Sequence, residues 1–437
     1  MEYPRSYSSS SSSSHYFNNH LQEEEERLNS VTSLNYSQSH YHPSTAAYHH
    51  CLATLKGHTS SYVSSLTLSG NFLYTGSSDR EIRSWDRSLL QSEFDHHSSS
   101  AANMVLAGKD LHKAVGFKRS FGAYWLSKQG AVKSLVVQSD MLFSAHQDHK
   151  IRVWKIRSHD NEAHNQKCTR VATLPTLGDR ATKVLIPKNH VQIRRHKKST
   201  WVHHVDTVSV LALSGDGALL YSVSWDRTIK IWRIRDFTCL ESVNNAHEDA
   251  INAMAVSTDG LVYSGSADKK IKVWKRVEEE KKHILVDILE KHNSGINALA
   301  LSCDETLLYS GACDRSILVW EKRETVEEEE GGGGGYNGKM VVVGKLKGHT
   351  KSILCLAVVC DLVCSGSADK TIRVWRKGNN NNEYSCLAVL EGHNGPVKCL
   401  TAVVDDGDPC DEGSSFLVYS GSLDCDVKVW KIFVPPL

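Results

Sequence analysis

The side chains in this chain that could do chemistry are a histidine, a serine and an aspartate that recur at fixed distances from one another. In one segment His247 is followed by Ser264, Asp268 and Trp274. Serine, histidine and aspartate are the members of an acyl-transfer triad, so this group taken alone would suggest a hydrolase. The group is repeated, however, and an active site is usually single. We therefore expect a structural role, in which hydrogen bonds from the indole through serine and histidine to aspartate satisfy buried polar groups.

The same spacing occurs seven times along the chain. Each copy ends in a tryptophan, at Trp85, Trp154, Trp232, Trp274, Trp320, Trp375 and Trp430. An aspartate stands six residues before each tryptophan, at Asp79, Asp148, Asp226, Asp268, Asp314, Asp369 and Asp424. A hydroxyl residue stands four residues before each aspartate, at Thr75, Ser144, Ser222, Ser264, Ser310, Ser365 and Ser420. The second copy lacks the upstream histidine, which the other six have at His58, His204, His247, His292, His349 and His393. Such a register indicates a chain built from repeats.

Each repeat holds about four short β-rich runs separated by turn residues. A four-stranded sheet cannot bury both faces alone, whereas blades stacked around an axis cover one another. The repeats resemble those of WD40 β-propeller proteins, in which Gly-His stands near the start and Trp closes the repeat. The resemblance covers residues 51–437 and implies an all-β, seven-bladed propeller.

The two ends of the chain predict how the ring closes. After Trp430 too few residues remain for the outer strand of the last blade. The segment Cys51 to His58 closely matches Cys386 to His393, which we place at the outer strand of blade 6 and its following loop. Residues 51–55 are therefore expected to complete blade 7. Residues 1–50, rich in Ser, Glu and His, are expected to form a disordered arm, because they cannot bury enough apolar area to order themselves.

Composition narrows the function classes. The 51 Lys and Arg balance 50 Asp and Glu, so any basic site must be local. No apolar run approaches the ~18 residues of a membrane helix, and none of the 12 cysteines forms a CxxC pair. We expect a reduced protein of the cytoplasm and the nucleus, with no metal, cofactor or membrane. The glycine-rich run ending at Met340 lacks the Ser or Thr of a phosphate loop, and we interpret it as a linker.

The turn residue that follows each aspartate is basic in most repeats, and these turns are expected at the same end of the ring as the histidine loops. The basic candidates are Arg80, Arg227, Lys269, Arg315 and Lys370, with His149 and Cys425 in the other two repeats. Such a ring around one mouth of the channel would suit an acidic or phosphorylated peptide. Trp225 stands where the other repeats have Ser, Gln, Ala, Cys or Leu, which makes it a candidate interaction anchor. Tyr62 and Trp201 are secondary candidates.

A basic run lies between blades 2 and 3, with no acidic residue from Ala181 to Val205. It contains Lys183, Lys188, Arg194, Arg195, Lys197 and Lys198. The run fits a nuclear-import signal, a dock for an acidic protein segment, a nucleic-acid site or a solvated loop. We do not favour nucleic acid, because Trp201 is the only stacking aromatic there.

A second short pattern concerns ubiquitin ligases. The segment Trp320, Glu321, Lys322, Arg323 resembles the ending by which some WD proteins dock to adaptors of cullin-RING ubiquitin ligases. Coincidental charge is the alternative interpretation.

A closer resemblance is to the plant Jingubang-like group of WD-repeat proteins, which is also labelled by similarity to the propeller of myosin heavy chain kinase B. It is carried by the segments Thr173 to Arg180, Pro187 to Asn189, Arg194 to Lys198 and His204 to Thr207. No kinase glycine loop or catalytic loop is present, so we expect no enzyme activity. The resemblance implies a scaffold or regulator in developmental signalling, such as pollen germination or growth. Its partners would be other proteins, such as transcription regulators or a ubiquitin-ligase adaptor. Residues 95–128 depart from the group.

Two alternatives to a developmental scaffold remain open. One is a substrate receptor of a cullin-RING ubiquitin ligase that uses the ending at Arg323. The other is a nucleic-acid-associated regulator that uses the basic residues between 183 and 198.

Overall fold

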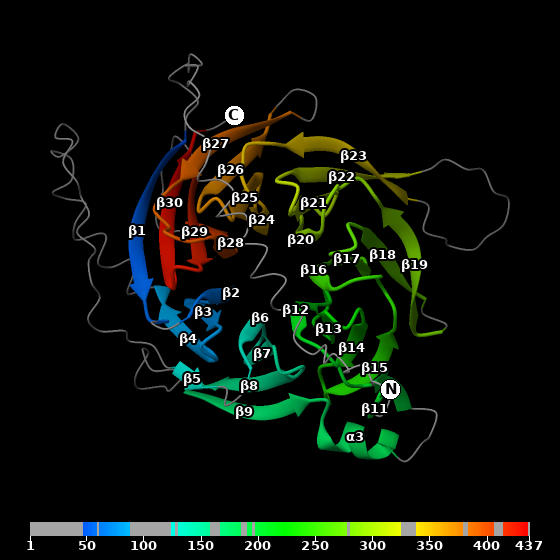
Figure 1. Cartoon of the computed structure of the whole chain (residues 1–437). Coiled ribbons are helices and arrows are strands. Elements are labelled where there is room, and N and C mark those ends of the chain that lie inside the picture. Colours follow the sequence, from blue (N-terminus) through cyan, green and yellow to red (C-terminus); the bar gives the residue numbers. More distant parts are fainter. Residues whose placement is uncertain are drawn as a thin grey trace, which may run out of the picture. The chain divides into compact units, whose positions relative to one another are not determined.

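A computed structural model describes residues 47–58, 61–87, 124–126, 130–157, 167–184, 190–194, 197–277, 280–324, 338–378, 383–405 and 414–435. Within them, seven four-stranded antiparallel sheets follow one another around an axis (Figure 1). The innermost strand of each sheet lies beside those of its two neighbours, so the ring is closed. This confirms the prediction of an all-β, seven-bladed propeller.

Each blade runs from an inner to an outer strand. Blade 1 contains β2 (Val63–Ser69), β3 (Phe72–Ser77), β4 (Glu81–Asp86) and β5 (Tyr124–Leu126). Blade 2 contains β6 (Val132–Gln138), β7 (Met141–His146), β8 (Ile151–Arg157) and β9 (Lys167–Leu174). Blade 3 contains β12 (Val208–Leu213), β13 (Leu219–Ser224), β14 (Ile229–Arg233) and β15 (Thr238–Val243). Blade 4 contains β16 (Ile251–Val256), β17 (Leu261–Ser266), β18 (Ile271–Val277) and β19 (Lys282–Leu289).

The remaining blades follow the same order. Blade 5 contains β20 (Ile296–Leu301), β21 (Leu307–Ala312), β22 (Ile317–Glu324) and β23 (Gly338–Leu346). Blade 6 contains β24 (Ile353–Val359), β25 (Leu362–Ser367), β26 (Ile372–Lys377) and β27 (Tyr384–Leu390). Blade 7 contains β28 (Val397–Val404), β29 (Ser414–Ser422), β30 (Asp426–Val434) and β1 (Tyr48–Lys56).

The core lies between the blades. Seven apolar clusters fill the seven spaces between neighbouring sheets. The second strands β17, β21 and β25 are buried at every residue, because each has a neighbouring blade on both faces. Gly311 in β21 allows one such close approach, since a Cβ there would lie 2.5 Å from Cγ2 of Ile353 in the next blade. The blades therefore depend on one another for stability.

The last blade is closed by the N-terminal strand, as predicted. Strand β1 pairs antiparallel with β30, from Tyr48 opposite Phe433 to Lys56 opposite Asp426. The predicted boundary between residues 50 and 51 was three residues late, because Tyr48, His49 and His50 already pair with β30. The remainder of the predicted arm, residues 1–46, lies outside the described residues.

The connection from blade 2 to blade 3 contains elements that the sequence did not predict. Helix α3 (Leu177–Val184) follows Thr176. The hydroxyl oxygen of Thr176 accepts a hydrogen bond from the backbone amide of Asp179 at 3.1 Å and so caps the helix. The hairpin of β10 (His190–Arg194) and β11 (Lys197–Thr200) comes next. No helix in the described part of the chain is long and apolar enough to cross a membrane.

Candidate partner-binding face

The repeated histidine, hydroxyl, aspartate and tryptophan residues form the expected hydrogen-bond chains in six blades. The histidine Nδ1 lies 2.8 to 3.1 Å from the aspartate Oδ2. Its Nε2 lies 2.8 to 2.9 Å from the serine or threonine oxygen. The indole N–H donates to that same oxygen at 2.8 to 3.1 Å.

These hydroxyls cannot act as nucleophiles in the described fold. Thr75, Ser222, Ser264, Ser310, Ser365 and Ser420 have no exposed surface. A substrate carbonyl therefore cannot reach them, and each already accepts the indole hydrogen bond. The geometry of the repeated group is that of a buried polar network, which specifies the local structure.

The aspartates of this network are held as carboxylates. Burial opposes ionisation of Asp268, but the hydrogen bond and charge of His247, together with backbone amides, lower its pKa to about 2. The pKa of Asp424 is lowered to about 2 in the same way by His393. The pKa values of Asp79, Asp226, Asp314 and Asp369 are also lowered, against burial, by their histidine partners.

Blade 2 builds its network differently. Ser144 still accepts the indole of Trp154 at 2.8 Å, but its histidine is His146, two residues later in the same strand. Asp148 is held instead by Arg152, at 3.0 and 2.5 Å. Burial first, and then the charge of Arg152, lower the pKa of His146 to about 3. The missing upstream histidine is thus replaced from within the blade.

One group of potential metal ligands lies within this network. His58, Asp79 and Glu81 offer ligand atoms close enough to share an ion. His58 and Asp79 are hydrogen-bonded to each other at 2.8 Å, and Glu81 pairs with Arg83 at 2.6 Å. The three side chains therefore already have protein partners.

The networks fix the turns that carry the basic candidates. The second carboxylate oxygen of Asp268 accepts a hydrogen bond from the backbone amide of Lys270 at 3.0 Å. This hydrogen bond closes a turn with Lys269 at its corner. Lys269 has φ of 72°, and all seven equivalent residues have positive φ. They are Arg80, His149, Arg227, Lys269, Arg315, Lys370 and Cys425. We call the end of the ring that carries these turns the turn face.

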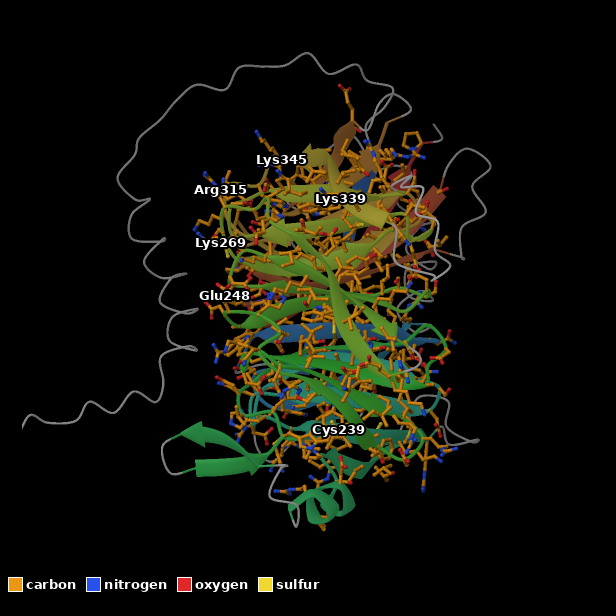
Figure 2. All side chains as sticks on the ribbon, turned by 90° about the vertical axis from the view of Figure 1, so that its right-hand side faces the viewer. Cys239, Glu248, Lys269, Arg315, Lys339 and Lys345 are labelled. Carbon is orange, nitrogen blue, oxygen red and sulfur yellow. The ribbon has the colours of Figure 1, made fainter. Side chains whose placement is uncertain are left out.

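Five of these corners carry an exposed lysine or arginine. We call them the basic rim: Arg80, Arg227, Lys269, Arg315 and Lys370. Lys269 and Arg315 lie along the same side of the ring, together with the acidic Glu248 (Figure 2). The structure therefore presents positive side chains from several blades on one face.

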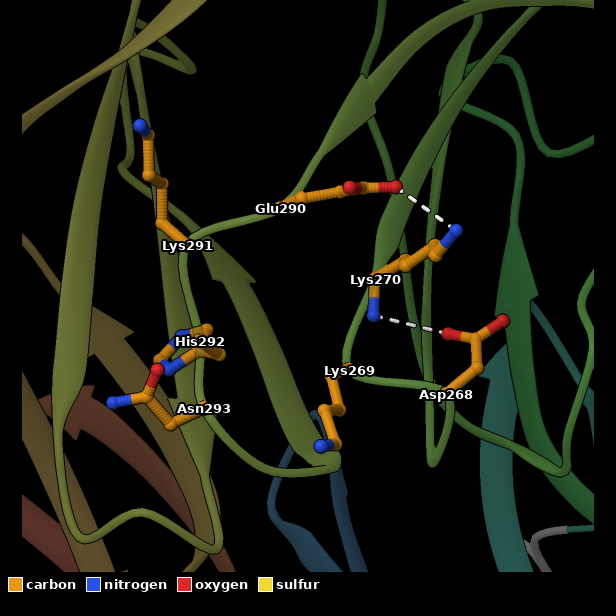
Figure 3. Close-up of a pocket in the computed structure, with 7 residues that line it drawn as sticks. All are labelled: Asp268, Lys269, Lys270, Glu290, Lys291, His292 and Asn293. Atoms are coloured by element: carbon orange, nitrogen blue, oxygen red, sulfur yellow. Dashed lines mark hydrogen bonds and ion pairs between the residues drawn. The ribbon is translucent and has the colours of Figure 1, made fainter.

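A hollow of about 340 Å³ opens on this face between blades 4 and 5 (Figure 3). Its lining includes Lys269, Lys291 and Asn293, and also Lys270, whose ammonium pairs with Glu290 at 2.9 Å. The hollow is open to solvent and of mixed charge, so it extends the basic rim rather than forming a separate enclosed site.

An aromatic and lysine cluster lies beside the inner strands on the turn face. Lys133 donates to the hydroxyl of Tyr62 at 3.1 Å. The same ammonium lies 5.7 Å from the ring centre of Tyr62 and 5.6 Å from that of Trp225. Tyr62 and Trp225 were candidates from the sequence, and in the structure both rings lie close to the ammonium group of Lys133. Sequence reasoning missed Lys133, although it stands where four other blades have Ser or Asn.

Trp201 takes a different position from the other aromatic candidates. It is half-buried and packs against the apolar cluster between blades 2 and 3. Its carbonyl oxygen accepts a hydrogen bond from Lys230 at 2.5 Å. Trp201 therefore contributes to the core beside the turn face.

The described part of the basic run between blades 2 and 3 lies in helix α3 and in the hairpin of β10 and β11. Arg194 ends β10, where it pairs with Lys197 of β11, and Lys198 pairs with Gln192. Lys183 lies in helix α3. Arg195 and Lys188 lie outside the described residues. The nucleic-acid alternative for this run stays a prediction.

The candidate ligase-docking residues lie on the third strand of blade 5. Trp320 is buried and bonded to Ser310, so it belongs to the blade 5 network. Arg323 pairs with Glu321 at 3.2 Å, and 62% of its side chain is exposed. Arg323 is thus accessible, while Trp320 is not.

Fold and networks together define a WD-repeat propeller. The chain belongs to the family described as WD domain, G-beta repeat, whose model matches residues 49–86, 195–233, 237–275, 284–321, 340–376 and 384–431. These segments make up more than half of the chain. Blade 2, with its altered network, lies outside all of them. Propellers of this family generally act as scaffolds that bind other proteins.

Curated relatives include other WD proteins. The chain is 29% identical to the "Small ribosomal subunit protein RACK1" of Drosophila melanogaster over 40% of this chain and 52% of that protein. It is 29% identical to "Protein ROOT INITIATION DEFECTIVE 3" of Arabidopsis thaliana over 46% of each. It is 24% identical to "Autophagy-related protein 16" of Arabidopsis thaliana over 47% of this chain and 37% of that protein. The chain thus spans about half or less of the length of these relatives. None of the three carries a Jingubang-like name.

Proposed function

We propose that this protein is a non-enzymatic scaffold that regulates other proteins by binding them on the turn face. The observation that carries the proposal is the basic rim, in which five equivalent corners of different blades expose lysine or arginine. Each corner is fixed by a buried network, so the side chains are presented from a rigid frame. A preorganised surface loses less conformational entropy when a partner binds.

The chemistry of the described residues supports binding over catalysis. The repeated Ser, His and Asp residues are occupied in holding the turns, and their hydroxyls are buried. The lysines and arginines of the basic rim are, in contrast, accessible on the turn face. These groups recognise carboxylates and phosphates by charge-assisted hydrogen bonds. A protein segment with acidic or phosphorylated side chains is the partner that fits them.

The setting of this scaffold is developmental signalling in plants. The resemblance of Thr173 to Arg180 and of His204 to Thr207 to the Jingubang-like group supports this part of the proposal, including a role in pollen germination or growth. An Arabidopsis relative whose name refers to root initiation agrees with a developmental role. We place the protein in the cytoplasm and the nucleus, because its cysteines form no CxxC pair and the basic run between Ala181 and Val205 fits a nuclear-import signal.

Affinity purification from the native tissue tests the proposal. The double variant Trp225→Ala, Arg227→Glu should lose specific partners that the wild type retains, while Lys339→Glu should keep them. Lys339 is exposed on β23, away from the turn corners, so it controls for charge reversal. All three proteins are first shown by thermal melting to be folded. An unchanged partner set in the double variant contradicts the proposal.

A second candidate function is that of a substrate receptor of a cullin-RING ubiquitin ligase. It is favoured by the exposure of Arg323 beside Glu321 in the segment that resembles an adaptor-docking ending. Arg323→Ala should then remove a ligase adaptor from the purified complex and leave partners of the turn face in place. Retention of the adaptor by Arg323→Ala rules out this route.

A further inference from the structure

Two lysines occupy the same position in blades on either side of blade 1. Lys133 is the second residue of inner strand β6, and Lys398 is the second residue of inner strand β28. The equivalent residue of β2, in blade 1, is Ser64. Its hydroxyl lies 3.0 Å from the carbonyl oxygen of Gly76 and 2.6 Å from that of Val132, so it bonds to backbone. Blade 1 thus places a small side chain between the two lysines.

The aromatic rings beside Lys133 already hold a cation. Its ammonium lies over both Tyr62 and Trp225, at 5.7 and 5.6 Å from the ring centres, and donates to the Tyr62 hydroxyl. A cation over an aromatic face uses the negative side of the ring. An incoming lysine or arginine would compete with Lys133 and be repelled by it. The cluster is therefore unsuited to a basic partner segment and suited to an anionic one.

Lys398 adds a second positive group to the same region. The two lysines stand at matching positions of inner strands that both lie beside β2. In agreement with this placement, burial lowers the pKa of Lys398, and the positive charge of Lys133 lowers it further. The other groups that act most strongly on Lys398 are Tyr62 and two cysteines. A negative group placed near both lysines would relieve their repulsion.

The cluster is confined to one arc of the turn face. The positions equivalent to Tyr62 and Trp225 are small in blades 4 to 6. They are Ala250 and Ala267, Gly295 and Cys313, and Ser352 and Ala368. Arg80 and Arg227 of the basic rim belong to blades 1 and 3, on the same arc as the cluster. A ligand would therefore meet its strongest contacts at one side of the ring.

We propose that Lys133 and Lys398 form a binding site for the phosphate group of a phosphorylated segment in a partner protein. This inference rests on the proposed function, because it names the chemistry of what binds the turn face. A phosphate carries roughly 1.5 to 2 negative charges and three acceptor oxygens, which match two ammonium groups and the Tyr62 hydroxyl. A carboxylate supplies one charge and fewer acceptors. Trp225 would pack against a side chain next to the phosphorylated residue.

Fluorescence polarisation with peptide pools tests the site. The full chain is titrated against labelled pools of random flanking sequence with a central phosphoserine, serine or glutamate. We expect the phosphoserine pool to bind on the order of tenfold more tightly than either other pool, as charge-assisted hydrogen bonds imply. Lys133→Gln should abolish this preference, Lys133→Arg should retain most of it, and Lys339→Gln should leave it unchanged.

Two results overturn the site. One is equal binding of the phosphoserine and glutamate pools, or no excess over the serine pool. The other is an unchanged phosphate preference in a folded Lys133→Gln protein. Either result can occur while the Trp225→Ala, Arg227→Glu variant still loses native partners. In that case the turn face binds partners without a preference for phosphorylated segments. Failure of this inference is therefore distinct from failure of the proposed function.

Discussion

Arg152 holds the carboxylate of Asp148 through two hydrogen bonds, of 3.0 and 2.5 Å, in the blade whose turn aspartate has no histidine partner. The guanidinium does what the histidine Nδ1 does in the other six blades, and His146 supplies the contact to the serine. The turn corner at His149 keeps the same positive φ as the others. The fold therefore preserves the turn although the residues that fix it have changed.

The altered network of blade 2 predicts a pH dependence of stability that arises from His146. Because burial and Arg152 lower the pKa of His146 from 6.5 to about 3, the unfolded chain binds a proton more readily than the folded one. The stability tied to neutral His146 is present above pH 6.5 and is lost as the pH falls toward 3. His146→Gln should therefore reduce the decline in unfolding free energy between pH 7 and pH 5, measured by urea denaturation. Parallel declines in the two proteins contradict this.

The regular networks predict a loss of stability, not of activity, when an aspartate is replaced. Asp268→Asn removes the charged partner of His247 while the side chain keeps its volume. We expect a decrease in unfolding free energy of about 1 to 3 kcal/mol, the usual cost of disrupting a buried charged hydrogen bond. Asp249→Asn, exposed on the same face, is the control and should change little. Equal stability of the Asp268 variant and the wild type would show that the network does not support the fold.

The lowered pKa of Asp268 predicts a second loss of stability in acid, at lower pH than the loss that arises from His146. The pKa of Asp268 is lowered from 3.8 to about 2, so its stabilising effect is present above pH 3.8 and is lost as the pH falls toward 2. Acid unfolding of Asp268→Asn should be less steep than that of the wild type in this window. Circular dichroism between pH 4 and pH 2 measures it, and identical acid limbs would be inconsistent with the lowered pKa.

Because β1 closes the ring, we expect its buried residues to contribute to the stability of the whole propeller. Leu55 is 2% exposed and packs in the cluster between blades 7 and 1. Leu55→Ala should lower the unfolding free energy by about 2 to 5 kcal/mol, as large core truncations do. Lys56→Ala, exposed on the same strand, should have little effect. Similar melting temperatures for the two variants would show that β1 is not needed to close the ring.

Much of the fold could be predicted because its signals lie in local sequence register. The tryptophan at a fixed distance from aspartate and hydroxyl marks the same hairpin in every blade, and the match of Cys51 to His58 with a later segment reveals the closing strand. His146 was not found, because it reaches its serine from within the strand and not from the preceding loop. Helix α3 was not found, because a short polar helix leaves no long apolar period.

The candidate site was only partly predictable for a related reason. The basic rim follows from the repeat, since its members stand directly after the turn aspartates. Lys133 stands in an inner strand, where the sequence alone suggests only a lysine exposed to solvent. Its contact with Trp225 joins blades 2 and 3 in space, and no spacing along the chain encodes that contact.

Site-specific photo-crosslinking tests most directly whether the turn face binds partners. A photoreactive benzoylphenylalanine is placed at Arg315, on the turn face, or at Lys339, on the outer strand β23 (Figure 2). Both proteins are expressed in the native tissue and irradiated. We expect partner adducts from position 315 and none of the same adducts from position 339. Adducts confined to position 339, or equal at both, would contradict the turn face as the binding surface.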